Sequence, residues 1–222
     1  KNKKIISFIA YTSLVIGLLI ILIISVSTSI NIFILVAACC FLGYLYQGPP
    51  FRFGYQGLGE PLCWLAFGPF AYSAVLIALN PSNIYFEDIP WKVSLLLGSG
   101  PSLATTLVLF CSHFHQISED KKHGKNSPLV RLGAKKGSQF VPWIIFTIYI
   151  FQLFTIVYGF IPVFCILYLL SFPQAIRLIN LLKSSYAKPS AIKNCKFVAI
   201  KFQTLNGIGL ITGLIFNYYL NK

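Results

Sequence analysis

The chain has few charged residues, and acidic residues are the scarcest. Charged residues make up 10% of its 222 residues, and five residues are acidic. A soluble domain carries about 25% charged residues. Because so few charges cannot cover a surface that faces water, the composition excludes an ordinary soluble protein. With 56% hydrophobic residues, the chain is predicted to be an all-α polytopic membrane protein.

Methionine is absent, and the chain opens with Lys1, Asn2, Lys3 and Lys4 directly before a hydrophobic segment. This start does not show the n-region and h-region of a signal peptide, so none is predicted. Because the hydrophobic sequence begins so abruptly, we expect that the chain lacks residues upstream of Lys1.

Cysteine pairs spaced as Cys-x-x-Cys are also absent, which removes the usual pattern of a redox or zinc motif. We predict that the cysteines are small buried hydrophobic residues, with a redox or metal role as the alternative. They are Cys39, Cys40, Cys63, Cys111, Cys165 and Cys195.

Long apolar runs, in contrast, fill most of the sequence. Seven runs are long enough, or nearly so, to cross about 30 Å of hydrocarbon at about 1.5 Å per residue. Helices are predicted because backbone polar groups in lipid must be bonded within the protein. The predicted spans are Ile5–Ile24, Ile30–Tyr46, Pro61–Leu79, Trp91–Cys111, Phe140–Tyr158, Phe160–Leu182 and Phe197–Leu220.

Basic residues lie almost entirely on one side of the predicted bundle. Of the 18 Lys and Arg residues, only Lys92 and Lys222 fall near the other side. The positive-inside rule therefore places the long connections 47–60, 112–139 and 183–196 in the cytosol or its equivalent compartment. Because the lysines are spread over several loops and match anionic lipid headgroups, nucleic acid is not predicted as a partner.

Ionisable residues are missing from the middle of most predicted spans, which argues against a proton or ion relay. The connections on the basic side are long and polar, whereas those on the other side are short. Elaborate loops on one face commonly carry the function. The chemistry is therefore predicted at one mouth of a helical bundle.

The first long connection contains Tyr44–Glu60, which reads YLYQGPPFRFGYQGLGE. Its glycines permit tight turns or the close approach of a ligand, and its two prolines stiffen the chain. Arg52 is a permanent cation that suits a carboxylate or a diphosphate. The alternative is an interfacial loop with an aromatic belt and an arginine that only marks the cytosolic side.

The second long connection contains His113–Gly133, which reads HFHQISEDKKHGKNSPLVRLG. Asp120 and Glu119 are candidate oxygen ligands for Mg²⁺, which typically binds one or two carboxylates plus substrate phosphates. The surrounding cations would meet the remaining oxygens of a phosphate anion. These cations are Lys121, Lys122, Lys125 and Arg131. The alternative is a solvated loop in which the acids only offset the lysines.

All three histidines of the chain lie in this second stretch. His113 and His115 are two residues apart and would not face each other on a helix, so a zinc site is not predicted. His115 is an alternative contact for diphosphate or water, and His123 is expected to be solvated. The histidines are therefore assigned minor roles.

Two stretches of these connections resemble those of UbiA-type membrane prenyltransferases. They are Y-x-G-P-P-x-R-x-x-Y-x-G-L-G-E at Tyr46–Glu60 and E-D-x-x-x-G-K-x-S-P-x-V-R-L-G at Glu119–Gly133. The span spacing also fits, so residues 1–222 are expected to form one transmembrane domain. The resemblance implies a nine-helix bundle with two aspartate-rich motifs at one mouth, which bind Mg²⁺ and a prenyl diphosphate. Two helices and the first motif, N-D-x-x-D-x-x-x-D, are then expected upstream of Lys1.

The second motif of the family commonly reads D-x-x-x-D-x-x-x-G-K. Alignment on Gly124 and Lys125 places Asp120 on the second aspartate and Gln116 on the first. Because glutamine carries no charge, the chain departs from the pattern here, and Glu119 is the candidate that compensates. Gln116 and Asp120, at i and i+4, would share one helical face and one ligand.

Within the family, the chain most resembles members that transfer phytyl from its diphosphate to 1,4-dihydroxy-2-naphthoate with loss of carbon dioxide, on the route to phylloquinone or menaquinone. Asp120 and Glu119 are assigned to Mg²⁺, and aromatic faces such as Phe51 would shelter the allylic cation. The predicted catalytic residues are Asp120, Arg52 and Tyr46. The predicted diphosphate contacts are Lys121, Lys125, Arg131 and Gln116, and the predicted acceptor contacts are Arg52, Tyr55 and Glu60.

Alternative functions stay open. The same chemistry would serve a polyprenyl donor, or homogentisate or 4-hydroxybenzoate as acceptor, and a different class is a non-catalytic membrane binding or transport protein. The resemblance also implies a cyanobacterial or plastid source. It would place the protein in a cytoplasmic or thylakoid membrane, with the active-site loops on the cytosolic side.

Overall fold

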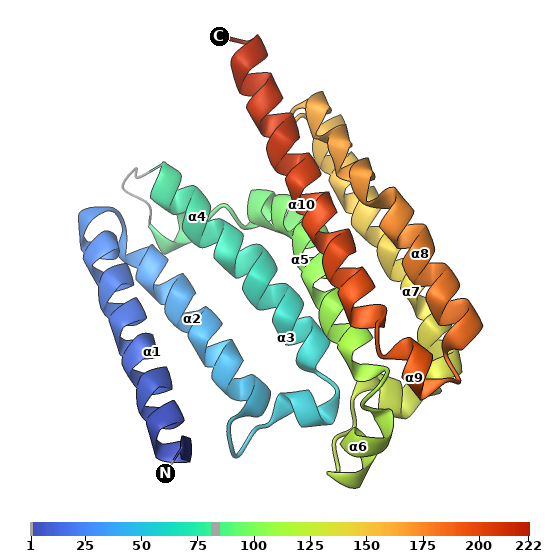
Figure 1. The fold of residues 1–222 in the computed structure, drawn as a ribbon. Coiled ribbons are helices and arrows are strands. Elements are labelled where there is room, and N and C mark those ends of the chain that lie inside the picture. Colours follow the sequence, from blue (N-terminus) through green and yellow to red (C-terminus); the bar gives the residue numbers. More distant parts are fainter. Residues whose placement is uncertain (1, 81–84) are drawn as a thin grey trace.

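The structure of the protein is a computed structural model that describes residues 2–80 and 85–222 (Figure 1). Every regular element in these two ranges is helical. Within these ranges, seven helical segments are long and apolar enough to cross a membrane, which confirms the seven predicted spans. The single-helix spans are α1 (Asn2–Ser27), α2 (Ile30–Gln47), α5 (Trp91–His113), α7 (Pro128–Val157) and α10 (Cys195–Leu220).

Two further spans are built from consecutive pieces. The third span joins α3 (Gly59–Leu65), the wide turn η2 (Ala66–Phe70) and α4 (Ala71–Leu79). The sixth joins the tighter helix η4 (Val163–Ser171) to α8 (Phe172–Ser185). The short helices η1 (Phe53–Gln56), η3 (Phe86–Asp88), α6 (Ile117–Lys122) and α9 (Pro189–Ile192) lie in the connections.

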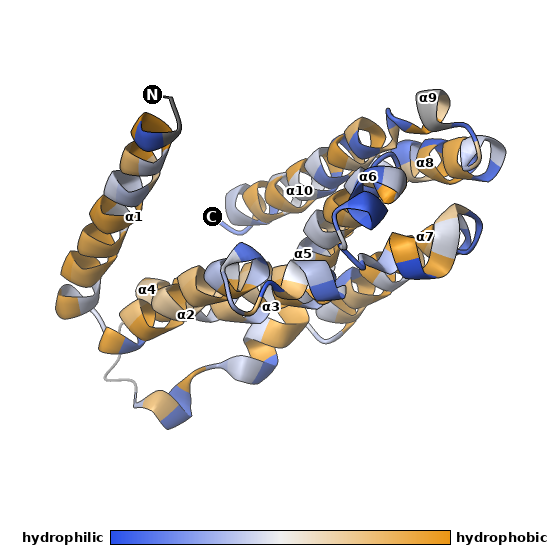
Figure 2. Cartoon of the chain, turned by 90° about the horizontal axis from the view of Figure 1, so that it is seen from below, coloured by the Kyte–Doolittle hydropathy of each residue, from blue (hydrophilic) through white to orange (hydrophobic). Residues whose placement is uncertain are grey.

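The spans run up and down, and α5 lies at the centre of the bundle. It packs against α3, η2 and α4 on one side and against α7 and α10 on the other. The turn after α2 and the helices α6 and α9 all lie at the lower end in Figure 1. Seen from that end, α1 stands at the edge of the molecule (Figure 2). The long connections therefore meet at one end, as the sequence predicts.

Small residues bring the third span and α5 into backbone contact. A Cβ atom on Gly98 would lie 2.9 Å from the carbonyl carbon of Gly68, and one on Gly68 would lie 2.6 Å from Ser102 Oγ. Gly68 also has a non-helical backbone, with φ −103° and ψ −106°, directly before Pro69. Such close crossings by small residues are a common way to associate helices in lipid, where apolar burial gives little drive.

A second close crossing joins α10 to η4. Gly209 and Gly213 of α10 form a Gly-x-x-x-Gly pair that faces the backbone of η4. A Cβ on Gly209 would lie 2.1 Å from the carbonyl oxygen of Leu167, and one on Gly213 would lie 2.5 Å from Cys165 Cα. Only glycine fits at these two positions.

Buried polar side chains lock the same half of the bundle. The amides of Gln152 in α7 and Asn206 in α10 bond to each other in both directions, at 2.6 and 3.0 Å. Ser171 bonds to the hydroxyl of Tyr149 at 2.9 Å. Because each partner satisfies the other, these groups are buried without a large desolvation penalty.

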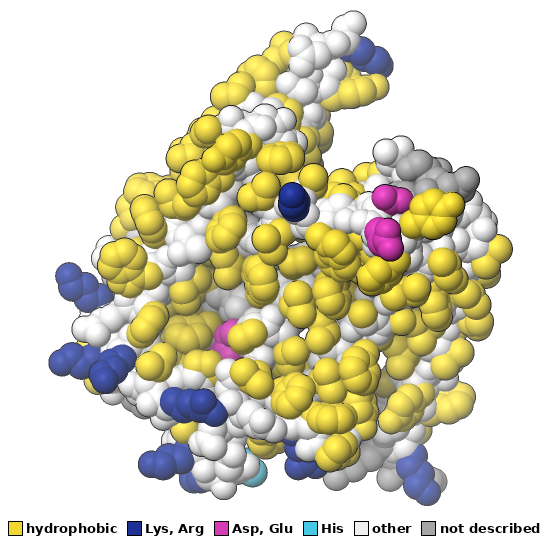
Figure 3. Space-filling model, turned by 180° about the vertical axis from the view of Figure 1, so that it is seen from behind, with side chains coloured by type: hydrophobic (Ala, Val, Ile, Leu, Met, Phe, Trp, Pro, Cys, Tyr) yellow, Lys and Arg dark blue, Asp and Glu magenta, His cyan; other side chains and the backbone are white. Residues whose placement is uncertain are grey.

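The surface of the protein is that of a membrane protein. Hydrophobic side chains cover most of the face in Figure 3, and dark-blue basic side chains gather at its lower rim. In α1 almost every described residue is exposed, and most of these are apolar. Such a surface is stable in hydrocarbon and not in water, so this is a multi-pass membrane protein.

Two predictions need correction. The stretch 112–139 is not a loop, because it contains the end of α5, all of α6 and the start of α7, with a break at Gly133 (φ 77°, ψ 158°). The fifth span thus begins at Pro128 rather than Phe140, since basic residues with good helix propensity continue the helix beyond the apolar run. The cysteines are all free, but Cys40 is exposed, and only Cys111, Cys165 and Cys195 are fully buried.

The two glycines of α10 at positions 207 and 209 offer a matched test of the helix crossing. Gly209→Ala should destabilise the protein by about 1–3 kcal/mol, because the new methyl group collides with the backbone of η4, which cannot move aside. Gly207→Ala adds the same methyl group where nothing lies within 4 Å, and its effect should stay within about 1 kcal/mol. Thermal unfolding of the two variants in detergent measures the difference, and equal midpoints would contradict the crossing.

Candidate functional site

The two connections that carry the predicted site pack against each other. The backbone N–H of Asn126 donates to the carbonyl of Tyr55 at 2.7 Å, and the guanidinium of Arg131 donates to the carbonyl of Gln56 at 2.5 Å. Gly57 has φ +79°, and a Cβ there would lie 2.8 Å from the carbonyl of Asn126. Glycine is therefore required where the first connection touches the second.

A row of four ionisable side chains joins the two connections beneath this contact. Glu60 Oε1 lies 3.3 Å from His113 Nδ1, at the start of α3 and the end of α5. Lys125 Nζ lies 3.4 Å from His113 Nε2 and 3.4 Å from Asp120 Oδ2. The four side chains are between 4% and 12% exposed, so all members of the row are shielded from bulk water.

Several atoms of this row have no hydrogen bond although they are buried. They are both carboxylate oxygens of Glu60, Nδ1 of His113 and Oδ2 of Asp120. The contacts of Glu60 with His113 and of Asp120 with Lys125 are within ion-pair distance but are not aligned as hydrogen bonds. Buried carboxylate oxygens without donors are unfavourable unless a ligand completes them. This is a sign of a binding site.

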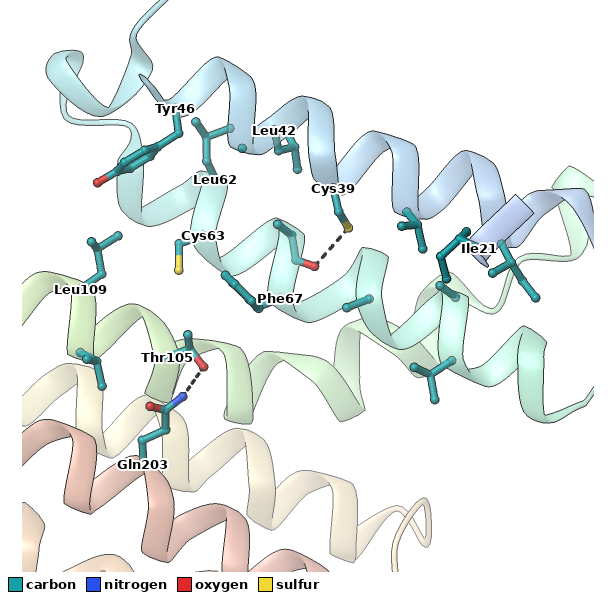
Figure 4. Close-up of a pocket in the computed structure, with 18 of the residues that line it drawn as sticks. Ile21, Cys39, Leu42, Tyr46, Leu62, Cys63, Phe67, Thr105, Leu109 and Gln203 are labelled. Atoms are coloured by element: carbon teal, nitrogen blue, oxygen red, sulfur yellow. Dashed lines mark hydrogen bonds between the residues drawn. The ribbon is translucent and has the colours of Figure 1, made fainter. Parts of the chain in front are cut away.

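An apolar cavity of about 920 Å³ extends from this end of the bundle between α1, α2, the third span and α5. Figure 4 shows Tyr46 at one end of the cavity and Ile21 at the other. Most of its lining is aliphatic, and its few polar groups include Thr105 and Gln203, which bond to each other at 2.7 Å. Phe67 and Val75 of the third span line the cavity and are more than half exposed. The cavity is therefore open rather than sealed inside the bundle.

Tyr46 connects the cavity to the row of ionisable groups. Its ring packs against Gly59, where a Cβ would lie 2.6 Å from Cε2 of the ring. It interacts electrostatically with both Glu60 and Asp120. The site thus has an apolar chamber that ends at a tyrosine and two carboxylates.

The remaining predicted residues of the second connection are placed differently. Glu119 is 63% exposed, and its carboxylate pairs with Lys122 at 3.6 Å and with His123 at 3.9 Å. Lys121 is exposed as well. Asp120, in contrast, is buried, so one of the two adjacent acids lies at the surface and the other in the interior. The carbonyl of Gln116 accepts the N–H of Asp120 at 2.7 Å, which agrees with the predicted helical register of these two residues.

Arg52 lies at the tip of the first connection, outside the buried row. It has φ 45°, is exposed, and stacks 5.8 Å from the centre of the Tyr55 ring. Phe51 beside it is also exposed and packs against Phe53. In the part of the chain that the structure describes, Arg52 has no ion pair with an acid, so its charge is available to an anion at the rim.

His113 is more deeply buried than its predicted minor role suggests. It is only 3% exposed and lies between Glu60 and Lys125, so it is a member of the buried row, and its minor role stays a prediction. The signal was present in its position at the very end of an apolar span, because a histidine there has no water around it and needs polar partners. Its partner Glu60 is distant in sequence, so spacing alone does not reveal the pair.

A model of the UbiA prenyltransferase family matches residues 3–200. The chain belongs to the UbiA prenyltransferase family. The match includes the paired connections, the row of ionisable groups and the first six spans, and it ends near the start of α10. No solved structure matches the chain.

Two curated relatives are similar to this UbiA family member over most of its length. A 2-carboxy-1,4-naphthoquinone phytyltransferase of Synechocystis sp. is 37% identical over 179 residues, which are 81% of this chain and 56% of that protein. The chloroplastic 2-carboxy-1,4-naphthoquinone phytyltransferase of Arabidopsis thaliana is 37% identical over 191 residues, which are 85% of this chain and 50% of that protein. The chain spans about half the length of the curated relatives it matches.

UbiA family prenyltransferases generally use a divalent metal ion. Within residues 2–80 and 85–222, no group of three or more His, Cys, Asp or Glu side chains is placed to hold one. Asp120, with its buried and unbonded Oδ2, fits a cation that takes one or two protein carboxylates and completes its shell with substrate phosphates. Asp120 is therefore a residue that would contact such an ion.

His115, next to the buried row, has a perturbed acidity. Burial is the main reason that the pKa of His115 lies below its ordinary value of 6.5, and the ammonium groups of Lys196 and Lys193 lower it further. The pKa is lower in the folded than in the unfolded protein, so the unfolded protein binds more protons as the pH falls below about 6.5. Acid therefore favours unfolding through this group.

His115→Gln should weaken the loss of stability on acidification. The thermal midpoint of the wild type should fall as the pH is lowered from about 8 to 5, and the fall should be smaller in the variant because the depressed group is gone. His123→Gln is the matched control, since His123 is 66% exposed and its removal should leave the pH dependence unchanged. Equal slopes for wild type and His115→Gln would contradict the assignment.

Proposed function

We propose that this chain forms the larger part of the catalytic domain of an enzyme that transfers a phytyl group from phytyl diphosphate to 1,4-dihydroxy-2-naphthoate. The observation that carries the proposal is the long apolar cavity that ends at Tyr46, next to buried and unbonded carboxylates and a lysine. A prenyl diphosphate has the same two halves, an apolar chain and a charged head. The names of the two relatives give the transferred group and the acceptor skeleton.

The donor fits the site with its chain in the cavity and its diphosphate at the mouth. The cavity runs along the spans from Tyr46 to the other end of α1 and α4 (Figure 4), which suits a long flexible hydrocarbon. Asp120 interacts electrostatically with Tyr46 at the end of the cavity and pairs with Lys125, and the exposed Lys121 and Arg131 lie on the same connection. Mg²⁺, when bound, would offset the charge of the leaving diphosphate, and Asp120 would contact it, with Glu119 at the surface as the less direct candidate.

The acceptor that reacts would be the reduced, dihydroxy form of the naphthoquinone. The relatives are named for 2-carboxy-1,4-naphthoquinone, and 1,4-dihydroxy-2-naphthoate is the two-electron-reduced form of the same skeleton. A quinone ring is electron-poor and a poor nucleophile, whereas the dihydroxy ring is electron-rich. Arg52 and Tyr55 at the rim are available to its carboxylate.

The reaction balances without a further reactant. The allylic C–O bond of the donor breaks, and the diphosphate leaves with the electron pair. The ring carbon that bears the carboxylate forms the new C–C bond to the allylic carbon. The bond to the carboxylate then breaks, carbon dioxide leaves, and its electron pair restores the aromatic ring. Aromatic faces such as Tyr46 would stabilise the cationic carbon, and the apolar cavity would exclude water that would otherwise trap it.

The loop-bearing end would face the cytosol or its equivalent in a cytoplasmic or thylakoid membrane. The basic residues that gather there support this orientation (Figure 3). The same site geometry would accept a polyprenyl donor or another hydroxyaromatic acceptor, such as homogentisate or 4-hydroxybenzoate, and competition among them in one assay decides the substrate pair.

The direct test uses membranes that contain the full-length protein, supplied with phytyl diphosphate, 1,4-dihydroxy-2-naphthoate and Mg²⁺. Phytylated product and carbon dioxide should form in equal amounts, and EDTA should stop both. Asp120→Asn should lower the rate by about 100-fold or more, because it removes the charge next to the diphosphate. Glu87→Gln, an exposed acid in η3, should leave the rate unchanged. Product formation that resists EDTA, or that survives Asp120→Asn, would sink the proposal.

The far end of the cavity offers a test of donor length. Ala78 of α4 lines the cavity, whereas its neighbour Leu79 is 77% exposed. Ala78→Phe should raise KM or lower kcat for phytyl diphosphate by about tenfold or more, since overpacking this site costs about 1–3 kcal/mol. Dimethylallyl diphosphate, whose chain is too short to reach Ala78, should react as in the wild type. Leu79→Phe is the control, and an equal loss for both donors would show that the chain lies elsewhere.

A further inference from the structure

The buried carboxylate of Glu60 has no hydrogen-bond donor within the part of the protein that the structure describes. Its carboxylate is 12% exposed, both oxygens are buried, and neither accepts a hydrogen bond. A carboxylate accepts several hydrogen bonds when it is satisfied. A buried acceptor without a donor is unfavourable, so a ligand that brings a donor to Glu60 would complete the site.

The row of ionisable groups fixes the state of His113 beside it. The ammonium of Lys125 has hydrogens and no lone pair, so His113 Nε2 at 3.4 Å must be the acceptor. The proton of the neutral imidazole is therefore on Nδ1, which lies 3.3 Å from Glu60 Oε1. The order is carboxylate, imidazole N–H, ammonium and carboxylate, so each member faces a group of opposite polarity.

The position of Glu60 near the cavity indicates which substrate group would donate a hydrogen bond to it. Tyr46, which lines the cavity, packs on Gly59, and Ser112 lines it just before His113, so Glu60 lies directly behind the lining of the chamber. An ionised diphosphate brings no hydrogen-bond donor and would be repelled by this carboxylate. The acceptor also carries a carboxylate, to which Arg52 is available, but its hydroxyl group brings the donor that the unbonded oxygens of Glu60 require.

We propose that Glu60 is the catalytic base that accepts the proton of the acceptor hydroxyl next to the attacked ring carbon, and that His113 is the positioning residue that holds it. This inference rests on the proposed function, and it adds a role for Glu60 beyond acceptor binding. As the O–H bond gives its proton to Glu60, its electron pair moves into the ring, and the ring carbon bonds to the allylic carbon.

The proton returns within the same turnover. When carbon dioxide leaves, its bonding electron pair restores the aromatic ring and leaves a phenolate on the same oxygen. Glu60 gives the proton back to this oxygen, so one cycle neither consumes nor releases a proton and needs no outside acid. Glu60 would take and return the proton inside a site that excludes water. Water is excluded because it would otherwise trap the cationic intermediate.

Three titratable groups lie close to Glu60. His113 at the end of α5 and Tyr46 at the end of α2 are on neighbouring elements, and Cys63 lies one turn along α3, the helix that carries Glu60. Lys125 and Asp120 follow His113 in the row. Of these groups, His113 has a ring nitrogen 3.3 Å from the carboxylate, although the contact is not aligned as a hydrogen bond, so it is the residue placed to orient the oxygen that receives the proton.

The test uses Glu60→Gln in membranes that contain the full-length protein, with Glu87→Gln as a matched control of the same chemistry at an exposed site. Glu60→Gln keeps the shape but cannot take a proton, so kcat should fall about 100- to 10,000-fold with little change in KM. Its residual rate should rise about tenfold per pH unit, because only acceptor that is already ionised in solution then reacts. The wild type and Glu87→Gln should be flat over the same pH range.

His113 is tested by rescue. His113→Leu removes the N–H that faces Glu60, and kcat should fall. His113→Asn places an amide N–H close to the position of Nδ1, and it should recover most of the rate. A loss that is equal in both variants, with equal thermal midpoints, would overturn the positioning role.

Donor activation separates this inference from the proposed function. Without acceptor, water slowly traps the allylic cation, and the wild type and Glu60→Gln should release diphosphate from the donor at equal Mg²⁺-dependent rates. If Glu60→Gln keeps the wild-type kcat, or loses activity with a flat pH profile, Glu60 is not the base and the transferase proposal stands. If the wild type neither releases diphosphate nor forms product, the proposed function fails, and the role of Glu60 fails with it.

Discussion

The constraint on which the whole structure depends is that hydrocarbon offers no hydrogen bonds. Backbone groups inside the bilayer must bond within the protein, so the described chain is helical wherever it spans. Charged side chains are equally unfavourable there, and the ionisable groups of the site gather at one end instead. The apolar cavity and the row from Glu60 to Asp120 are two results of the same constraint. The first lies where only hydrocarbon is stable, and the second lies where the spans end.

The alternation of charges in the row from Glu60 to Asp120 allows these groups to stay buried. Two carboxylates, one ammonium and one neutral imidazole alternate within 3.3–3.4 Å of their neighbours. A single buried charge would be strongly unfavourable, but alternating partners offset much of that penalty. The carboxylates outnumber the ammonium in this row, so a metal ion would offset their charge and a hydrogen-bond donor from a substrate would complete their unbonded oxygens. The site is thus stable enough to fold and still incomplete without its ligands.

The fold was largely predictable because apolar runs report spans directly. The seven spans and the meeting of the two connections follow from hydropathy, glycine and charge along the chain. Two features could not be read in this way. Arg131, Lys135 and Lys136 lie in α7, because polar residues with good helix propensity extend a span beyond its apolar part. The contact between Glu60 and His113 depends on the packing of α3 against α5, which local sequence does not encode. For the same reason Glu119 and Asp120 are adjacent in sequence but differ fully in exposure.

The backbone crossing at Gly68 and Gly98 has a consequence for how relatives of this protein diverge. Because the two backbones touch at this crossing, no side chain there can be trimmed, and the spacing of the third span and α5 is fixed. The wall from α1 and α2 consists of side chains such as Ile21, Val36 and Leu42. Changes in the bulk of the hydrophobic substrate are therefore accommodated by side chains away from the crossing. Relatives that use substrates of different length should differ in the residues of α1 and α2 and in the small residues of α4. The glycines at the crossing should be the same in all of them.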